Sequence, residues 1–164
     1  MARAIKILIL AFAVPMLYAC GTLKDPVVVK NSSISDYKYV YITPTKELSS
    51  STSGAYMGQN GVMYGSTESK SVNPSDVIAG ALIKKGFIII PELSPKLQNK
   101  TLIANYGESG RRKKGLGYTI EVTIQFISAK SYETVCSCTA EGQGSTEADD
   151  IRIAINRAMS ALFK

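Results

Sequence analysis

Three cysteines, at positions 20, 136 and 138, carry the most distinctive chemistry in this sequence of 164 residues. The sequence has no histidine, which excludes Ser-His-Asp and Cys-His catalytic centres and most zinc hydrolase sites. Cys136 and Cys138 would share one face of a strand with Cα atoms about 7 Å apart, the far limit for a disulfide. We interpret them as small buried side chains under a helix. A strained redox pair is the alternative, and a metal site would need ligands from elsewhere.

Cys20 stands at the end of an apolar run that follows two basic residues. Arg3 and Lys6 precede the uncharged stretch 7–17, and this order is typical of a secretory signal. The run is too short to stay in a bilayer as a helix, which needs about 20 residues. Leu17-Tyr18-Ala19-Cys20 resembles the lipobox of bacterial lipoproteins. The resemblance implies cleavage before Cys20 and attachment of a diacylglycerol to its thiol.

Lipidation at Cys20 would place the mature chain on a membrane. Residues 1–19 would be the signal peptide and 20–35 a lipidated tether. Two or three acyl chains anchor a protein stably, since each buried methylene contributes about 0.8 kcal/mol. Gly21 to Lys24 lack both the aspartate and the acidic cluster that redirect some lipoproteins of this kind. We therefore expect anchoring through N-terminal acyl chains at the outer membrane, on its periplasmic side.

The remaining residues are enough for one domain with a hydrophobic core, which we place at 36–164. The formal net charge is +6 at pH 7 and falls to +4 once Arg3 and Lys6 are removed. This excess is too small to indicate nucleic-acid binding. We expect no nucleic acid, no cofactor and no metal among the ligands of this chain.

The hydrophobic periodicity predicts two helices and several strands. Asn73, Pro74 and Gly86 delimit a helix over 72–86, and Thr146 caps a second over 146–164. The predicted strands are 36–43, 87–93, 100–107, 118–130 and 134–142, and Val27–Val29 are compatible with an added edge strand. This order predicts the α+β class. We expect a two-layer sandwich with a mostly antiparallel sheet of four to five strands and both helices on one face, in the order β-α-β-β-β-α.

Residues 46–72 are rich in serine and glycine and nearly free of aliphatic side chains. We expect a long surface loop here, with a small hairpin at its tip. Tyr56 and Tyr64 lie symmetrically about an Asn60-Gly61 pair, which is a hairpin signal. Long loops in compact domains are usually functional or disordered, and Tyr56, Asn60 and Tyr64 are candidates for partner contact.

Two further groups of residues admit a functional and a structural interpretation. Arg111 and Arg112, followed by two lysines, lie between glycines, where we expect a solvated loop between strands. They are also candidates for contact with anionic lipid head groups or an acidic partner. The pair Asp149-Asp150 has the chemistry of a metal or acid/base site, but its place in the first turn of the second helix favours stabilisation by the helix dipole.

The element order, with the KKGF junction at 84–87 and the strand-turn-strand YTIEVTIQFISAKSYETV, is similar to a group of periplasmic lipoprotein domains. The group includes the curli-secretion pore subunit, the N-terminal domain of the Tol-Pal propeller protein, and small envelope lipoproteins of unknown function. The resemblance covers about residues 37–163 and implies the fold more than the function.

These observations favour a non-enzymatic envelope lipoprotein that acts as an interaction or assembly module, with an envelope protein or a second copy as partner. Two alternatives remain open. One is a ligand- or lipid-binding accessory lipoprotein, and the other is an oligomeric ring component of a secretion or transport system. No nucleophile is placed beside a base by the sequence pattern, so we do not expect an enzyme.

Overall fold

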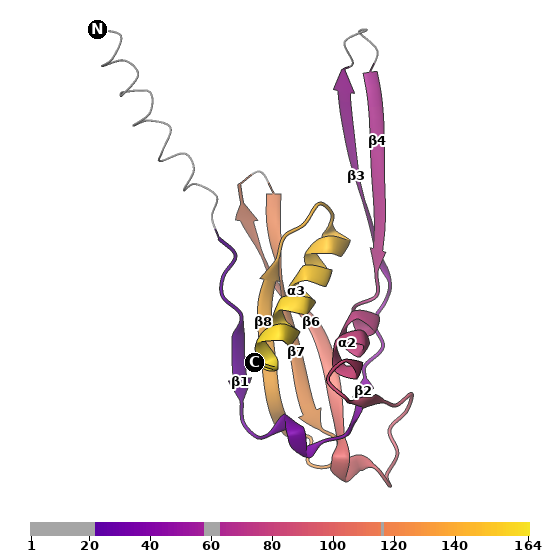
Figure 1. Ribbon diagram of the computed structural model, residues 1–164, viewed down its shortest axis with the longest axis vertical. Coiled ribbons are helices and arrows are strands. Elements are labelled where there is room, and N and C mark those ends of the chain that lie inside the picture. The colour runs from indigo at the N-terminus through magenta and orange to yellow at the C-terminus, as the bar shows by residue number, and fades with distance from the viewer. Residues whose placement is uncertain (1–21, 58–62, 116) are drawn as a thin grey trace, which may run out of the picture.

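The computed structural model describes residues 22–57, 63–115 and 117–164. These residues form a six-stranded mixed sheet, a two-stranded sheet, and two α-helices, α2 and α3. Figure 1 shows both helices in front of the large sheet and the two-stranded sheet reaching beyond it as a hairpin. The expected fold class is wrong, because eight strands in two sheets replace one mostly antiparallel sheet of four to five strands.

The large sheet has the strand order β1-β8-β7-β6-β2-β5. The pairs β1–β8, β8–β7 and β7–β6 are antiparallel, whereas β2 runs parallel to both β6 and β5. Parallel pairing requires a crossover connection. Between β2 and β5 this connection consists of the two-stranded hairpin followed by α2. The strands are β1 Val27–Lys30, β2 Tyr39–Ile42, β5 Ile88–Ile89, β6 Thr101–Lys114, β7 Gly117–Ser128 and β8 Thr134–Gly142. Short 3-10 helices span Ile34–Asp36 and Gln98–Lys100.

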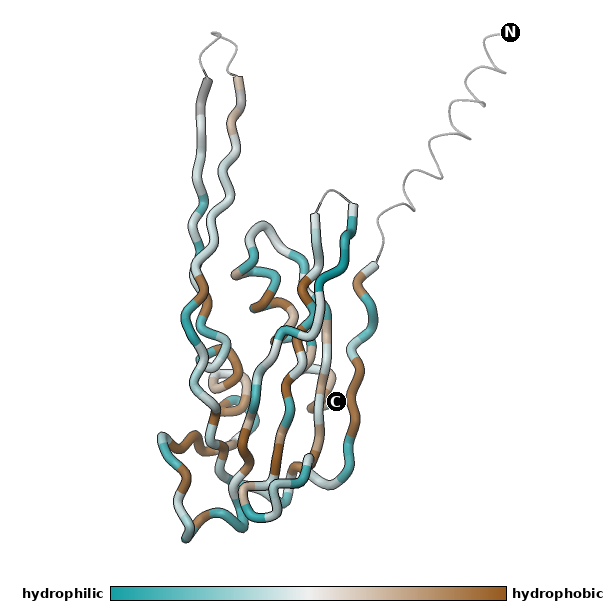
Figure 2. The backbone as a smooth tube through the Cα atoms, turned by 180° about the vertical axis from the view of Figure 1, so that it is seen from behind, coloured by the Kyte–Doolittle hydropathy of each residue, from teal (hydrophilic) through white to brown (hydrophobic). Residues whose placement is uncertain are grey.

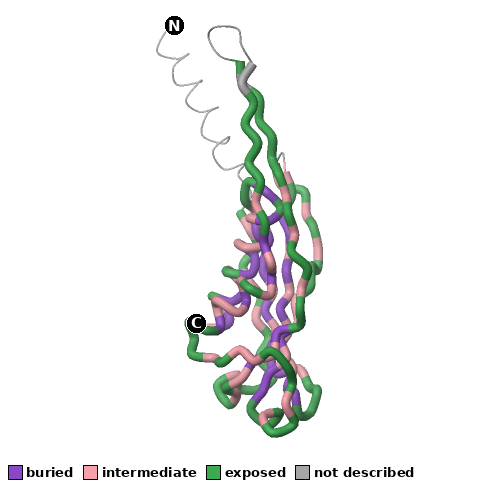
Figure 3. The backbone as a smooth tube through the Cα atoms, turned by 90° about the vertical axis from the view of Figure 1, so that its right-hand side faces the viewer, coloured by how far each residue is buried: buried purple, intermediate pink, exposed green. Residues whose placement is uncertain are grey.

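The hydrophobic core lies between the large sheet and the two helices (Figure 3). Alternate residues of β7 face the helices and are buried, namely Ile120, Val122, Ile124 and Phe126. The helices contribute Ile78, Leu82, Ile151, Ile155 and Leu162. The alternation predicted for 118–130 is therefore confirmed from Ile120 onward, while Tyr118 is exposed.

Helix α2 spans Pro74–Ile83 and begins as predicted, with proline in its first turn. Asn73 occupies the N-cap position, but its side chain bonds elsewhere: Oδ1 accepts hydrogen bonds from Thr45 Oγ1 at 2.6 Å and Ser75 Oγ at 2.9 Å. Gly86 follows the helix with a φ of 88°, a left-handed conformation that glycine adopts without strain.

Helix α3 spans Glu147–Leu162, and Thr146 caps it as predicted. Thr146 Oγ1 accepts a hydrogen bond from the Asp149 amide at 3.3 Å. Three acidic residues, Glu147, Asp149 and Asp150, occupy its first turn, where the helix dipole favours negative charge. Neither α2 nor α3 has the length and apolarity that a membrane-crossing helix needs.

Residues 46–72 differ most from expectation. Instead of a loop with a small hairpin at its tip, they form β3, Leu48–Met57, and β4, Met63–Val72, paired over ten residues on each arm. The sequence lacks the apolar alternation by which a half-buried strand is recognised, because most of the hairpin buries neither face. Figure 2 accordingly shows this hairpin in pale colours, whereas the strands of the large sheet carry hydrophobic positions.

Three other elements have different lengths from those predicted. β6 continues through 108–114, where the sequence predicts a solvated loop, because it pairs with β7 up to Lys114↔Gly117. β5 retains only Ile88–Ile89 of the predicted strand 87–93, and Pro91 follows it, which cannot donate to a ladder. β1 places part of the expected tether in the sheet, beside β8.

Candidate interaction surface

The half of the hairpin nearest the domain, residues 48–52 and 68–72, packs on the N-terminus of α3. We call it the docked half. Ser50 Oγ accepts a hydrogen bond from the Ala148 amide at 2.9 Å, and Thr52 Oγ1 donates one to the Ser145 carbonyl at 2.8 Å. The first amides of a helix have no partner within the helix. Ser50 therefore stabilises the start of α3 and holds β3 in place.

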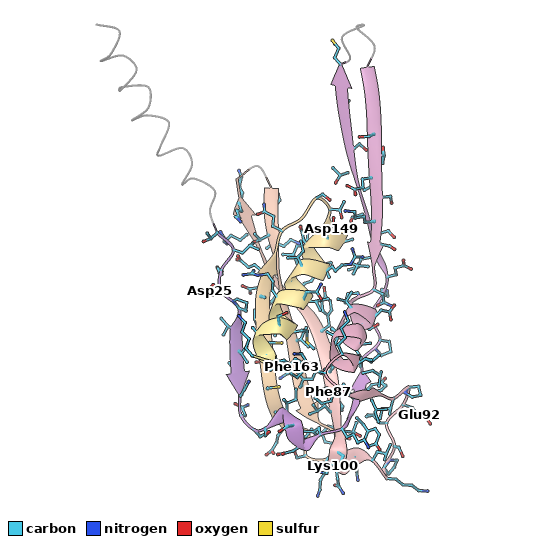
Figure 4. The ribbon with its side chains drawn as sticks, in the orientation of Figure 1. Asp25, Phe87, Glu92, Lys100, Asp149 and Phe163 are labelled. Carbon is cyan, nitrogen blue, oxygen red and sulfur yellow. The ribbon has the colours of Figure 1, made fainter. Side chains whose placement is uncertain are left out.

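An ion pair fixes the second arm. Lys70 Nζ lies 2.7 Å from Asp149 Oδ2 and 2.9 Å from Glu68 Oε1. The hydrogen bond from Lys70 lowers the pKa of Asp149, and the same bond raises the pKa of Lys70. Figure 4 shows Asp149 in the first turn of α3, beside β4. Asp149 thus serves as a docking partner, and the described residues contain no group of three acidic, cysteine or histidine side chains able to hold a metal.

The other half of the hairpin, residues 53–57 and 63–67, projects from the domain, and we call it the distal half. Every residue of it whose burial is described is exposed, including Met57 at 73%. The whole stretch 53–67 contains no charged residue. Among its described side chains, Ser53 and Thr67 bond to each other at 3.2 Å, across the two strands. The distal half is therefore an exposed, uncharged two-stranded arm.

Two of the predicted contact residues lie on this arm. Tyr56 and Tyr64 are directly opposite each other in the β3–β4 register, as the symmetry of the sequence predicted. Asn60 lies outside the described residues, as does Cys20. The structure therefore brings the two tyrosine positions together at the far end of the arm.

The predicted contact residues Arg111 and Arg112 lie on opposite faces of β6 and make ion pairs within the chain. Arg111 faces the helix layer, where it pairs with Glu147 of α3 and lies 3.5 Å from Glu108. Arg112 faces the other side, where Nε and Nη2 bind the two carboxylate oxygens of Glu141 at 2.9 and 2.7 Å. Both guanidinium groups thus have acidic partners inside the domain.

Glu141 is the centre of a cluster that holds the N-terminal segment, and we call Lys24, Arg112, Glu141 and Arg157 the tether clasp. The Lys24 amide donates to Glu141 Oε2 at 3.0 Å, and Arg157 Nη2 donates to the Lys24 carbonyl at 2.8 Å. Glu141 is only 2% exposed. The hydrogen bonds from Arg112, with help from Lys24, lower the pKa of Glu141 to about 2, so it is ionised at neutral pH.

Glu141, Lys24 and Arg157 are functional residues that the sequence alone does not reveal. Glu141 follows the core-facing residues of β8 and occupies the polar face of that strand, where a charged residue normally meets water. Its burial comes from Arg112 and Lys24, which are 29 and 117 residues away in sequence. Glu141 is the one charged residue of β8, and this is the signal in the sequence that points to such a partner.

Cys136 and Cys138 are buried free thiols on the core face of β8, as predicted. Burial raises their pKa values to about 11 and about 12. Since the thiolate is the reactive form, neither is poised as a nucleophile at neutral pH.

Two open grooves of about 700 and 720 Å³ flank α3. The first lies between α2 and α3, and its lining includes Lys84, Lys85 and Phe163. Phe163 packs against Phe87 with ring centroids 5.9 Å apart (Figure 4). The second groove lies between α3 and the start of β1.

No family model matches this chain, and no curated protein sequence matches it. Among solved structures, the chain resembles a PelC dodecamer from Paraburkholderia phytofirmans at 15% identity and a TM-score of 0.48, over 87% of this chain and 96% of that one. It also resembles a leucine-to-methionine variant of the PelC dodecamer from the same organism at 16% identity and a TM-score of 0.44, over 84% and 96%. Likeness at this level carries no information about what this chain binds.

Proposed function

We propose that this chain is a non-enzymatic lipoprotein of the outer membrane and the repeated subunit of a homo-oligomer joined through the β3–β4 hairpin. The observation that carries the proposal is the distal half of the hairpin. It is an exposed, uncharged arm beyond the domain. The lipobox-like sequence before Cys20 supports the anchoring.

The arm has an incomplete set of hydrogen bonds. A two-stranded hairpin by itself is marginally stable in water, and the outer edges of both strands present unpaired amide and carbonyl groups. The docked half gains support from α3 through Ser50, Thr52 and Lys70. The distal half has no such support among its described side chains, so pairing with another chain would stabilise it.

A second copy of the chain has the matching shape. Both arms of the hairpin have ten residues in one uninterrupted register, so the free edge of β3 in one copy can pair along the free edge of β4 in the next. This contact joins two different edges and is therefore head-to-tail. Head-to-tail contacts generate rings when the rotation closes.

Removal of the distal half tests this proposal. Thr52 and Glu68 are paired across the hairpin, so an Asn-Gly turn in place of 53–67 joins them with the right geometry. We expect the full-length parent to be oligomeric in detergent and the shortened protein monomeric. The loss of several intersubunit backbone hydrogen bonds, each contributing about 1 kcal/mol, corresponds to a rise of 100-fold or more in the dissociation constant. Light scattering coupled to size exclusion measures both.

The shortened protein keeps the contacts of the docked half, so its unfolding temperature should match that of the parent. A parent that is monomeric at about 100 μM contradicts the homo-oligomer. A shortened protein that remains oligomeric contradicts the role of the hairpin. A monomeric parent whose hairpin crosslinks to a different envelope protein in cells would instead support a module that binds another protein.

Replacement of Cys20 tests the anchor. In Cys20→Ser we expect the chain to keep residues 1–19 and to lack acyl groups, because serine does not provide the thiol that the lipobox resemblance requires. Mass spectrometry of the intact chain measures both features, and fractionation should show the variant leaving the outer membrane. Cys138→Ala is the matched control, since it also removes a thiol but should leave processing and membrane location unchanged. A parent whose mass differs from that of the Cys20→Ser variant only by the replacement of sulfur with oxygen would refute lipidation.

A further inference from the structure

The tether clasp determines which end of the domain lies next to the proposed anchor. Lys24 is held by Glu141 and Arg157 through its backbone amide and carbonyl. Cys20 precedes Lys24 by four residues, a length that spans at most about 14 Å. An acylated Cys20 therefore keeps this end of the domain within about 14 Å of the membrane surface.

The tip of the β6–β7 hairpin lies at the same end (Figure 1). Its described residues include Lys113 and Lys114, the last two residues of β6, and Tyr118 of β7, which pairs with Lys113. Lys113 is exposed and Tyr118 is 60% exposed. Within the described part of the chain, neither lysine forms an ion pair, whereas the preceding Arg111 and Arg112 both do.

We propose that this tip docks on the head groups of an anionic phospholipid bilayer, with Lys113 and Lys114 as the cations and Tyr118 at the interface. The proposal rests on the lipid anchor at Cys20. Lysines near an anionic membrane surface each contribute attraction, and tyrosine is enriched at membrane–water interfaces. The short reach from Cys20 favours lipid over an acidic protein, because the anchor itself supplies the bilayer.

Three acidic side chains near the tip pair with cations other than Lys113 and Lys114. Glu147 is paired with Arg111, and Glu141 with Arg112. Glu121, on the open face of β7, lies 3.8 Å from the Lys24 ammonium group. Asp150 lines the hollow that Tyr118 also lines and accepts a hydrogen bond from the Gly144 amide. In the described part of the chain, none of these carboxylates forms an ion pair with Lys113 or Lys114.

The β3–β4 hairpin extends past the same end in all three backbone views (Figures 1–3). Its segment 53–67 has no charged side chain, so contact of the arm with lipid head groups would bury no charge. Because the arm reaches beyond the tip, it would enter the head-group region when the tip docks, and its edge amide and carbonyl groups would need partners there, such as the hairpin of a neighbouring copy.

The absence of tryptophan from the sequence permits a direct test. A single tryptophan is introduced as Tyr118→Trp at the tip, or as Tyr132→Trp in the turn between β7 and β8, at the other end of the sheet, where Tyr132 is 73% exposed. The full-length acylated proteins are reconstituted into vesicles of phosphatidylcholine alone or with phosphatidylglycerol. We expect the tryptophan at 118 to shift to shorter emission wavelength and to be quenched by brominated lipid only in the anionic vesicles. The tryptophan at 132 should not respond.

The lysines are tested in the Tyr118→Trp background. Lys113→Gln with Lys114→Gln should reduce the docked-to-undocked ratio of the tip about 25-fold, from about fivefold for each lysine near an anionic surface. Lys84→Gln with Lys85→Gln, the same change in an exposed pair at the end of α2, should have no effect. High salt should reverse the docking, because exposed charges are then screened.

Two results would overturn the proposal while leaving the anchor intact. One is a vesicle-bound protein whose tryptophan at 118 keeps the emission of a water-exposed residue in anionic vesicles. The other is an equal shift in neutral vesicles that is insensitive to the lysine changes. Failure of the parent to associate with any vesicle, together with an unacylated Cys20, would overturn the anchor and this proposal together.

Discussion

Gly142→Ala is expected to destabilise the domain by about 3 to 5 kcal/mol, a large part of the stability of an ordinary domain. A Cβ atom at Gly142 would lie 1.9 Å from the Asp150 carbonyl oxygen and 2.6 Å from the Ala154 amide nitrogen. These two groups are four residues apart and belong to consecutive turns of α3. The end of β8 therefore lies directly against the helix backbone, and only glycine leaves room for this contact.

The matched control is Gly107→Ala. Gly107 is also a strand glycine, but a Cβ atom there meets nothing within 4 Å. Alanine at this position should leave the free energy of unfolding unchanged within about 0.5 kcal/mol. Urea titrations followed by circular dichroism measure both variants. Equal stability of the Gly142→Ala variant and the parent would show that β8 and α3 are not in this contact.

Arg112→Ala is expected to lower the free energy of unfolding clearly more than Arg111→Ala does. The difference comes from the acidic partners. Arg112 holds Glu141, which is 2% exposed, whereas Arg111 and its partner Glu147 are both open to solvent. Loss of Arg112 leaves the buried Glu141 carboxylate without its main cation. Loss of Arg111 removes a partner from Glu147, whose carboxylate already contacts water. Similar effects of the two substitutions would contradict the tether clasp.

The pH dependence of stability provides a second test of the Arg112→Ala and Arg111→Ala variants. The pKa of Glu141 is about 2 in the folded chain, below its ordinary value of 4.5. The unfolded chain therefore takes up this proton first. The stabilisation is present above pH 4.5 and is lost as the pH falls from 4.5 toward 2. In the Arg112→Ala variant the main cause of the low Glu141 pKa is absent. The loss of stability on acidification that comes from Glu141 should therefore be smaller in this variant. In Arg111→Ala it should persist.

The helices were predictable because their signals are local. Pro74, Gly86 and Thr146 are each interpreted from a few neighbouring residues, and the structure confirms all three. The same holds for the alternation of β7 and the burial of Cys136 and Cys138.

The sheet was not predictable to the same extent, because its composition depends on distant pairing. β6 extends through a run of four basic residues, where charge and flanking glycines indicate a loop. It remains a strand because β7 pairs with it and Glu141 and Glu147 neutralise two of the charges. The sequence predicts only a small hairpin at the tip of 46–72, and the full length of β3 and β4 was not predictable because these strands pair only with each other and show no buried face.

The candidate surface was partly predictable. The symmetry of the sequence about Asn60 correctly places Tyr56 opposite Tyr64. The similarity to the curli-secretion pore subunit and the Tol-Pal propeller domain stays an expectation. The tether clasp joins residues from the first and last parts of the chain, so no short stretch of sequence announces it.

The pairing of β1 with β8 has a mechanical consequence for a chain anchored at its N-terminus. β1 is joined to β8 through four residue pairs, from Val27↔Thr139 to Lys30↔Cys136, and the backbone of Lys24 is bound just ahead of it. If Cys20 is acylated, a pull on its fatty chains would act along β1 and load that ladder in shear, with its bonds sharing the force. The domain would then move together with its lipid anchor when the lipid is pulled out of the bilayer, because no long flexible linker separates the anchor from β1.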